Sequence, residues 1–230
     1  MGLSLEVGIL ADLHENDEEG YQHFCNQFDA LTTHLNTASL PLHTEPADCE
    51  VWSCDMFGYS GLHYLRRIAA HLDSTGQLPQ PGNDNASEDP VLKQYFEHVI
   101  GRKPSLAQRI FAKQPGFLRA FDHLIVHSDA EGFYLPIEFS DVLYPDEKLE
   151  VAGGMIGSAV HLLNECKRIA NVLEIPSDLD ETSDALWEAA DSQGEGERKW
   201  QRYGIESFSC VCLMRGCIKS IETKAALVFV

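Results

Sequence analysis

The hydrophobic positions along the chain follow two periods, one typical of strands and one typical of helices. Residues 3–10 alternate apolar with small or polar side chains, which predicts a half-buried strand. Residues 16–35 place aromatic and aliphatic side chains at steps of three and four, which predicts an amphipathic helix. The last five residues, 226–230, are all apolar. We therefore expect the chain to end as a strand buried within a sheet.

The same reasoning divides the middle and the C-terminal part of the chain into further elements. A short strand is expected at 50–53, and an acidic segment at 177–197 with Leu186 and Trp187 as its apolar anchors. Residues 77–89 are rich in turn-forming side chains and predict a mobile loop. Five more helices are expected to begin at Ser60 as an N-cap, at Pro90, near Ser105, at Ser158 and near Lys199.

The most pronounced β pattern spans residues 122–139. Two apolar runs, 123–127 and 133–139, flank a turn segment at 128–132, which predicts a central hairpin. In that register His123, His127, Tyr134 and Glu138 share the polar face. His123 would then lie opposite Glu138, and an ion pair between them would raise the pKa of the histidine. Pro136 lacks an N–H donor, so the second strand is expected to be an edge there.

Together these elements predict an α+β fold in a single domain of residues 1–230. A small, mainly antiparallel sheet, including the central hairpin near 122–139, would pack against several amphipathic helices. A chain of 230 residues with 44% hydrophobic side chains can bury a core of this kind.

Charge narrows the possible functions. The chain has 17 Lys and Arg against 36 Asp and Glu, a formal charge of −19. This argues against a nucleic-acid binder that acts by bulk electrostatics, because phosphate binding needs clustered basic side chains. The acids are concentrated in two blocks: residues 1–65 hold 11 acids and no Lys or Arg, and residues 120–197 hold 18 acids against 3 basic residues. A local basic stretch lies between the blocks, at residues 102–119. One explanation of these acidic blocks is that they keep the protein soluble. The other is that they form an acidic docking surface for a basic protein partner.

The sequence also indicates a compartment. The N-terminus has no basic segment, and Asp12 and Glu15 interrupt any apolar stretch, so we expect no secretory signal and a cytoplasmic protein. No apolar run is long enough to span a membrane.

The seven cysteines are expected to be mostly reduced core thiols. The spacings of Cys49 with Cys54, and of Cys210 and Cys212 with Cys217, lack the C-x2-C pattern of structural zinc sites. We therefore expect no metal and no cofactor.

One partial motif suggests catalysis. Ser60 lies in the run Gly58–Leu62, which partly matches the strand-turn-helix elbow that carries a nucleophilic serine, although Leu62 stands where that turn needs glycine. As an alternative to a protein with an acidic docking surface, the chain would be a hydrolase or a small-molecule binder. Its candidate catalytic residues are Ser60, His63, His127 and Asp129. Its candidate binding residues are Tyr59, Arg66, His123, His127, Asp129, Glu131, Tyr134 and Glu138.

Two segments of the sequence support the hypothesis of an acidic docking surface. Residues 127–139 (HSDAEGFYLPIEF) and 157–165 (GSAVHLLNE) resemble segments of small, acidic, uncharacterised bacterial proteins of the α+β class, a group that includes immunity proteins of toxin systems. The resemblance implies a protein of similar size and acidity and assigns no functional residue. We therefore expect a non-enzymatic cytoplasmic interaction protein with an acidic docking surface, of which an immunity-type protein is one form; its oligomeric state stays open.

Overall fold

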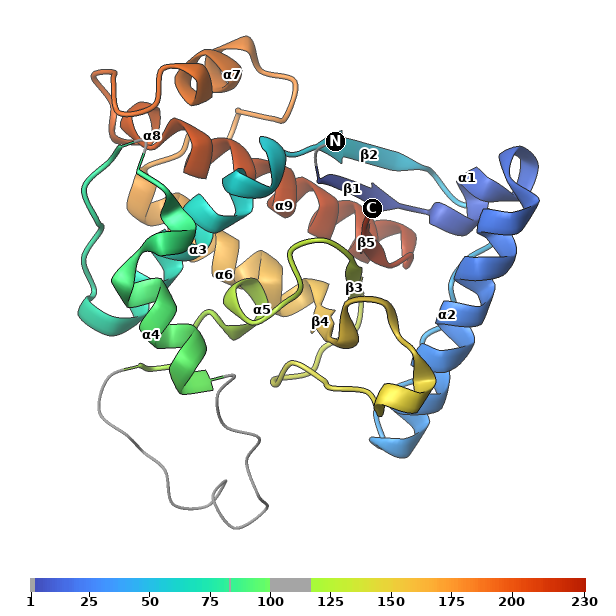
Figure 1. The fold of residues 1–230 in the computed structure, drawn as a ribbon. Coiled ribbons are helices and arrows are strands. Elements are labelled where there is room, and N and C mark those ends of the chain that lie inside the picture. The colour runs from blue at the N-terminus through green and yellow to red at the C-terminus, as the bar shows by residue number, and fades with distance from the viewer. Residues whose placement is uncertain (1–2, 83, 100–116) are drawn as a thin grey trace.

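The C-terminal strand occupies the centre of the sheet. The computed structural model describes residues 3–82, 84–99 and 117–230, except the side chains of Glu15 and Tyr59. In this part of the chain five strands form one sheet in the order β2-β1-β5-β3-β4 (Figure 1). The strands are β1 Ser4–Val7, β2 Trp52–Asp55, β3 Gly132–Leu135, β4 Ile156–Ser158 and β5 Leu227–Phe229. Three of the four neighbouring pairs are antiparallel, and β3 with β4 is parallel. The predicted α+β class, the mainly antiparallel sheet and the buried terminal strand are confirmed.

Helices cover both faces of this sheet (Figure 1). They are α1 Ile9–Asn16, α2 Glu18–Thr37, α3 Gly58–Thr75, α4 Pro90–Val99, α5 Asp122–Ile125, α6 Ala159–Leu173, α7 Asp184–Asp191, α8 Lys199–Arg202 and α9 Gly204–Thr223. Short 3-10 turns lie at Ala86–Glu88, Glu147–Leu149 and Ala152–Gly154. Leu227 and Phe229 of β5 belong to the core shared with α3, α6 and α9, whereas Val228 belongs to the core shared with α2. The alternation of side chains along one strand thus joins two apolar layers.

The first strand is shorter than its sequence pattern predicts. β1 ends at Val7, and a helix, α1, begins at Ile9. Gly8 makes the change of direction with φ +85°, a left-handed conformation that favours glycine. A Cβ atom on residue 8 would lie 3.0 Å from Cys49 Sγ and 3.2 Å from the Glu50 carbonyl oxygen. The expected strand over 3–10 is therefore wrong beyond Val7, because the backbone turns where only glycine fits.

The expected central hairpin is also wrong. Residues Asp122–Ile125 form the short helix α5, and β3 pairs with β5 on one side and β4 on the other. β3 ends at Leu135, so Pro136 follows an inner strand rather than sitting on an edge strand. The run 123–127 is wholly buried and so is the strand β3, so both faces of these segments are apolar surroundings and their alternation misled the prediction.

Two buried ionisable side chains hold the two ends of α5. At its start, the carboxyl group of Glu165 on α6 accepts the N–H groups of His123 (3.1 Å) and Leu124 (2.7 Å). At its end, the guanidinium of Arg66 on α3 donates to the carbonyl oxygens of Leu124, His127 and Ser128 at 2.9, 2.6 and 3.1 Å. The cation at the end of α5 follows the helix dipole, which favours positive charge there. Side chains of α3 and α6 therefore bond the backbone groups that would have paired between the two strands of a hairpin.

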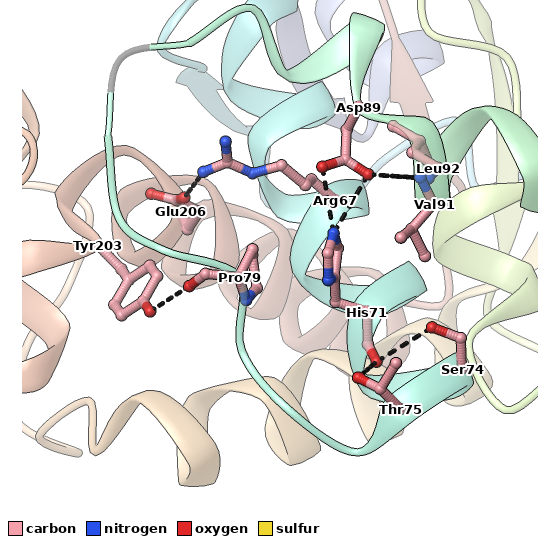
Figure 2. A network of polar contacts seen from close by, with 10 residues as sticks. All are labelled: Arg67, His71, Ser74, Thr75, Pro79, Asp89, Val91, Leu92, Tyr203 and Glu206. Atoms are coloured by element: carbon pink, nitrogen blue, oxygen red, sulfur yellow. Dashed lines mark hydrogen bonds and ion pairs between the residues drawn. The ribbon is translucent and has the colours of Figure 1, made fainter.

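The segment predicted to be a mobile loop, 77–89, is tied to neighbouring helices at its two ends (Figure 2). Tyr203 Oη donates to the Pro79 carbonyl oxygen at 2.6 Å, and His71 Nε2 lies 3.1 Å from a carboxylate oxygen of Asp89. Asp89 also accepts the N–H groups of Val91 and Leu92, so it caps α4 as the sequence predicts. Beside this segment, Arg67 and Glu206 form a buried ion pair at 3.1 Å. The mobility of 77–89 stays a prediction.

Three further expectations have different outcomes. α3 begins at Gly58 and makes no side-chain cap, so Ser60 is not its N-cap. The short helix expected near 105–113 lies outside the described residues. Within the described ranges, no helix combines the length and the apolar character that a bilayer crossing requires.

Replacing Arg66 tests the importance of the α5 contacts. We expect Arg66→Met to lower the free energy of unfolding by at least about 3 kcal/mol, because three carbonyl oxygens lose a buried donor. Urea unfolding followed by circular dichroism measures this loss. The control Arg202→Met changes an exposed arginine of α8 and should cost less than about 0.5 kcal/mol. A loss below about 1 kcal/mol for Arg66→Met would contradict this account of α5.

Candidate functional site

The histidines expected on an open polar face are instead buried in the core. His123 is 1% exposed, and its Nδ1 accepts the N–H of Ser158 at 3.0 Å. Its Nε2 therefore carries the proton and faces the Ser140 carbonyl oxygen at 3.3 Å. Burial, with His161 stacked 5.1 Å away, lowers the pKa of His123 to about 4. The expected ion pair with Glu138 and the expected rise in pKa are wrong: Glu138 is exposed, and desolvation favours the neutral ring.

His127 is enclosed in the same way. Its ring stacks on Tyr134 with centroids 4.0 Å apart, and its two nitrogens face the carbonyl oxygens of Ser128 and Phe133, each at 3.1 Å. Burial lowers the pKa of His127 to about 4. Gly132, with φ +130°, leaves room for the ring, since a Cβ there would lie 2.8 Å from His127 Cε1. His127 and Tyr134 are adjacent, but they pack inside the protein rather than sharing the polar face of a hairpin.

Arg66 and Tyr134, two other candidate binding residues, also serve the core. Arg66 is 2% exposed and bonds the end of α5, as described above. Tyr134 Oη donates to the His123 carbonyl oxygen at 2.8 Å, and burial raises the pKa of its phenol. Neither side chain faces solvent.

Two candidate catalytic residues do meet at the surface. His63 Nε2 lies 3.1 Å from Asp129 Oδ2, with 21% and 48% of the two side chains exposed. Burial and the nearby Arg66 lower the pKa of His63, although Asp129 acts in the opposite direction. Ser60 is exposed one turn earlier on α3, and its hydroxyl donates to the Phe57 carbonyl oxygen at 3.4 Å. In the described residues, no hydrogen bond joins Ser60 to His63, so the nucleophile and base of a hydrolase are not connected.

The remaining candidates form no common site. Glu131 and Glu138 are exposed, and the side chain of Tyr59 lies outside the described residues. The basic stretch at 102–119 also lies mostly outside them; Arg119, its last member, pairs with Asp122 at 2.6 Å.

Two hollows lie elsewhere, one of about 330 Å³ beside His98 and Phe117, and one of about 440 Å³ between Trp52 and the end of α9.

The acidic surface is most regular on α7. Residues 178–197 hold eight acids and no Lys or Arg. Asp184, Glu188 and Asp191 are exposed and spaced i, i+4 and i+7, so they share one face of α7. We call these three residues the α7 stripe. Leu186, fully buried, fixes the opposite face of the helix on the core. Among the described residues, no lysine or arginine lies within ion-pair distance of the stripe.

The charges of the α7 stripe follow a line along the helix axis, with wider spacing than the phosphates of DNA. A helix rises 1.5 Å per residue, so the three carboxylates span an axial distance of about 10 Å, with steps of roughly 6 and 4.5 Å. One strand of duplex DNA carries a phosphate about every 3.4 Å along its axis. The linear charge density of the stripe is therefore about two thirds of that of one DNA strand and about one third of that of the duplex.

The position of the α7 stripe is not explained by helix stability. Glu188 and Asp191 lie in the last turn of α7, where the helix dipole disfavours anions, and no basic side chain lies in that turn. Asp184 and Glu188 are like charges four residues apart, which also repel. α2 shows the contrast: Glu18 and Glu19 lie in its first turn, and Asp17 caps the N–H of Gly20, all favourable positions.

The sequence pattern contained the signal for this stripe. The acidic block of residues 120–197, its anchors Leu186 and Trp187, and the spacing of the acids at 184, 188 and 191 are all present in the sequence. A search for acids at i, i+4 and i+7 would have found it.

Comparison with protein families gives one result for the whole chain. Residues 1–229 match the model of the family described as "Putative DNA-mimic protein". No curated protein and no solved structure matches the chain.

This match corrects one expectation drawn from charge. The expectation of no nucleic acid by bulk electrostatics is overturned by this match, because it left out a relation to nucleic acid through mimicry of its charge. A protein that mimics DNA is related to nucleic acid by carrying the same sign of charge, so its targets are proteins that bind DNA. A basic partner is compatible with this relation. The immunity-type resemblance receives no support from the match beyond the acidic character.

The burial of His127 predicts a pH dependence of stability. Its pKa is lowered in the folded protein to about 4, from an ordinary value of 6.5, so its contribution is complete above pH 6.5 and is lost as the pH falls through 4. One such histidine removes about 1.4 kcal/mol per pH unit within this window. We expect His127→Gln to reduce the slope of unfolding free energy against pH by about that amount, measured by urea unfolding. His23→Gln, on the exposed side of α2, should leave the slope unchanged; an unchanged slope for His127→Gln would contradict the assignment.

The two acidic helices predict stability changes of opposite direction. Glu188→Gln with Asp191→Asn should raise the free energy of unfolding by about 0.5–1 kcal/mol, because it removes anions from the end of α7. The matched double variant Glu18→Gln with Glu19→Gln should lower it by a similar amount, because it removes anions from the start of α2. Each double variant removes two negative charges, so the overall repulsion between the negative charges of the protein falls equally in both. Thermal and urea unfolding of both variants measure the difference; shifts of the same sign and size would refute the dipole argument.

Proposed function

Because the chain belongs to the family described as "Putative DNA-mimic protein", we propose that it binds a DNA-binding protein and presents the α7 stripe in place of DNA phosphates. The observation that carries this proposal is the α7 stripe itself. Three exposed carboxylates share one helix face and have no described ion-pair partner, and two of them, Glu188 and Asp191, lie in the last turn of α7, where anions reduce helix stability. Charges retained at such a cost are expected at functional surfaces.

The chemistry of the stripe favours one class of partner. Phosphate contacts position a protein on DNA, whereas hydrogen bonds to base edges provide sequence specificity. Carboxylates on a helix reproduce the charge of phosphates and offer no base edges. The expected partner is therefore a protein that binds duplex DNA through its backbone, with little sequence preference.

An aromatic side chain beside the stripe supplies a second kind of contact. Trp187 is 39% exposed, and the rest of its ring packs on Phe208 with centroids 4.2 Å apart. Tryptophan held rigidly at a surface is enriched among the side chains that dominate binding energy. We infer that Trp187 contacts the partner while the carboxylates beside it meet basic side chains.

A protein-interaction role without catalysis is favoured over the hydrolase alternative. The family concerns mimicry of DNA, and the pair of His63 and Asp129 lacks a connected nucleophile among the described residues. An immunity-type role and a cytoplasmic location stay predictions. They are compatible with this proposal if the partner is a toxin that cleaves DNA without sequence preference.

A competition experiment tests the proposal. A sequence-independent duplex-DNA-binding protein is first saturated with a short fluorescent duplex, and displacement is followed by anisotropy at low salt. We expect the wild-type protein to displace the duplex, and the triple variant Asp184→Asn, Glu188→Gln, Asp191→Asn to be weaker by roughly tenfold, since each exposed ion pair contributes about 0.2–1 kcal/mol. Raising the ionic strength should weaken the wild-type protein in the same assay.

The matched control removes three acids from α2, Glu18→Gln, Glu19→Gln and Asp29→Asn, and should change displacement by less than about twofold. Equal losses in the two triple variants would attribute binding to net charge and overturn the assignment to α7. A wild-type protein that displaces DNA from none of a panel of sequence-independent DNA-binding proteins would overturn the proposed function as a whole.

A further inference from the structure

Two thiols that are distant in the sequence meet where the edge strand β2 packs on α9. The Sγ atoms of Cys54 and Cys212 lie 3.0 Å apart. A disulfide bond is about 2.05 Å long, so the two sulfurs are within about 1 Å of bonding distance. Cys54 is half-buried on β2, at the edge of the sheet, whereas Cys212 is buried on α9.

We propose that Cys54 and Cys212 are a redox-active pair that forms a reversible disulfide between β2 and α9. This pair differs from the other close cysteines of the core. Cys166, Cys210 and Cys217 are each 0% exposed, so a dissolved oxidant cannot reach any of them directly. Cys54 combines access from the edge of the sheet with a second sulfur directly behind it, which is the arrangement of an attacking and a resolving thiol.

The chemistry requires a disulfide oxidant such as oxidised glutathione. The thiolate of Cys54 attacks one sulfur of the oxidant, a mixed disulfide forms, and one glutathione leaves as a thiolate. Cys212 then loses its proton to solvent, its sulfur attacks Cys54 Sγ, and the second glutathione leaves. The two protein thiols lose two protons and two electrons in total, and the oxidant gains the electrons as two thiols. The hydrogen bond with Cys54, together with burial, raises the pKa of Cys212, so the second step is expected to be the slower one.

The bond would link residues 158 positions apart in the sequence. Within the sheet, β2 has β1 as its neighbour, and its Trp52 donates from Nε1 to Glu181 at 2.9 Å. A covalent link to α9 would restrict the unfolded chain strongly because it closes a long loop. The disulfide would therefore hold the edge strand against the helical layer under oxidising conditions and release it on reduction. This inference does not rest on the proposed function.

The test uses the wild-type full chain incubated with an excess of oxidised glutathione or with dithiothreitol. After free thiols are alkylated, peptide mapping by mass spectrometry should find the Cys54 peptide joined to the Cys212 peptide. The oxidised protein should melt at a temperature higher by roughly 5 °C or more, and dithiothreitol should reverse the shift. Cys54→Ser should lose both the cross-link and the shift. Cys25→Ser, which changes another half-buried cysteine, should behave as the wild type.

Several results would overturn the inference. The inference fails if the peptide map recovers Cys54 only as a glutathione adduct or as the free thiol. It also fails if Cys54 is joined to a cysteine other than Cys212. An unchanged melting temperature in fully cross-linked protein would refute the stabilising link. If Cys54→Ser does not fold, the peptide map and the reversible shift of the wild type still decide between these outcomes.

Discussion

The placement of Arg66 and Glu165 at opposite ends of α5 is the interaction on which the rest of the core depends. A helix of four residues leaves nearly all its N–H and C=O groups without partners of its own, and α5 is buried. Glu165 satisfies its start and Arg66 its end, so α6 and α3 are fixed to the same short segment. Burial raises the pKa of Glu165 to about 8, which shows how far this carboxyl group is removed from water. β3 is joined to α5 as well, through the bond from Tyr134 to His123.

Charge thus has two separate uses in this protein. The buried ionisable groups serve the fold: Arg66 and Glu165 hold backbone groups, and Arg67 pairs with Glu206. The exposed charges are numerous and mostly negative. Glu18 and Glu19 at the start of α2 match the helix dipole, whereas Glu188 and Asp191 at the end of α7 oppose it. A surface that opposes local stability is the part of an acidic protein that most needs a functional explanation, and mimicry of DNA provides one.

The elements predicted best are those whose burial follows a regular period. α2, α6 and β5 lie close to their expected positions because each presents one continuous apolar face or run. The prediction failed at Gly8, where a left-handed residue turns the chain, and over 122–127, where both sides of the segment are buried. Of the candidate site, His63 and Asp129 do meet, while His123 and His127 proved to be core residues because their polar atoms find backbone partners.

By itself the sequence determined the sign of the charge, its concentration in two blocks, and the elements with a clear period, since these properties depend on composition and on neighbours a few residues apart. Only the tertiary structure decided which polar side chains are buried and which strands pair. The partners of α5 lie 58 positions before it on α3 and 41 positions after it on α6, distances over which a local pattern carries no information. The contact between Cys54 and Cys212, which are 158 positions apart, also lies beyond the reach of a local sequence pattern. The α7 stripe lies between these cases: its spacing is in the sequence, but its exposure depends on how Leu186 packs.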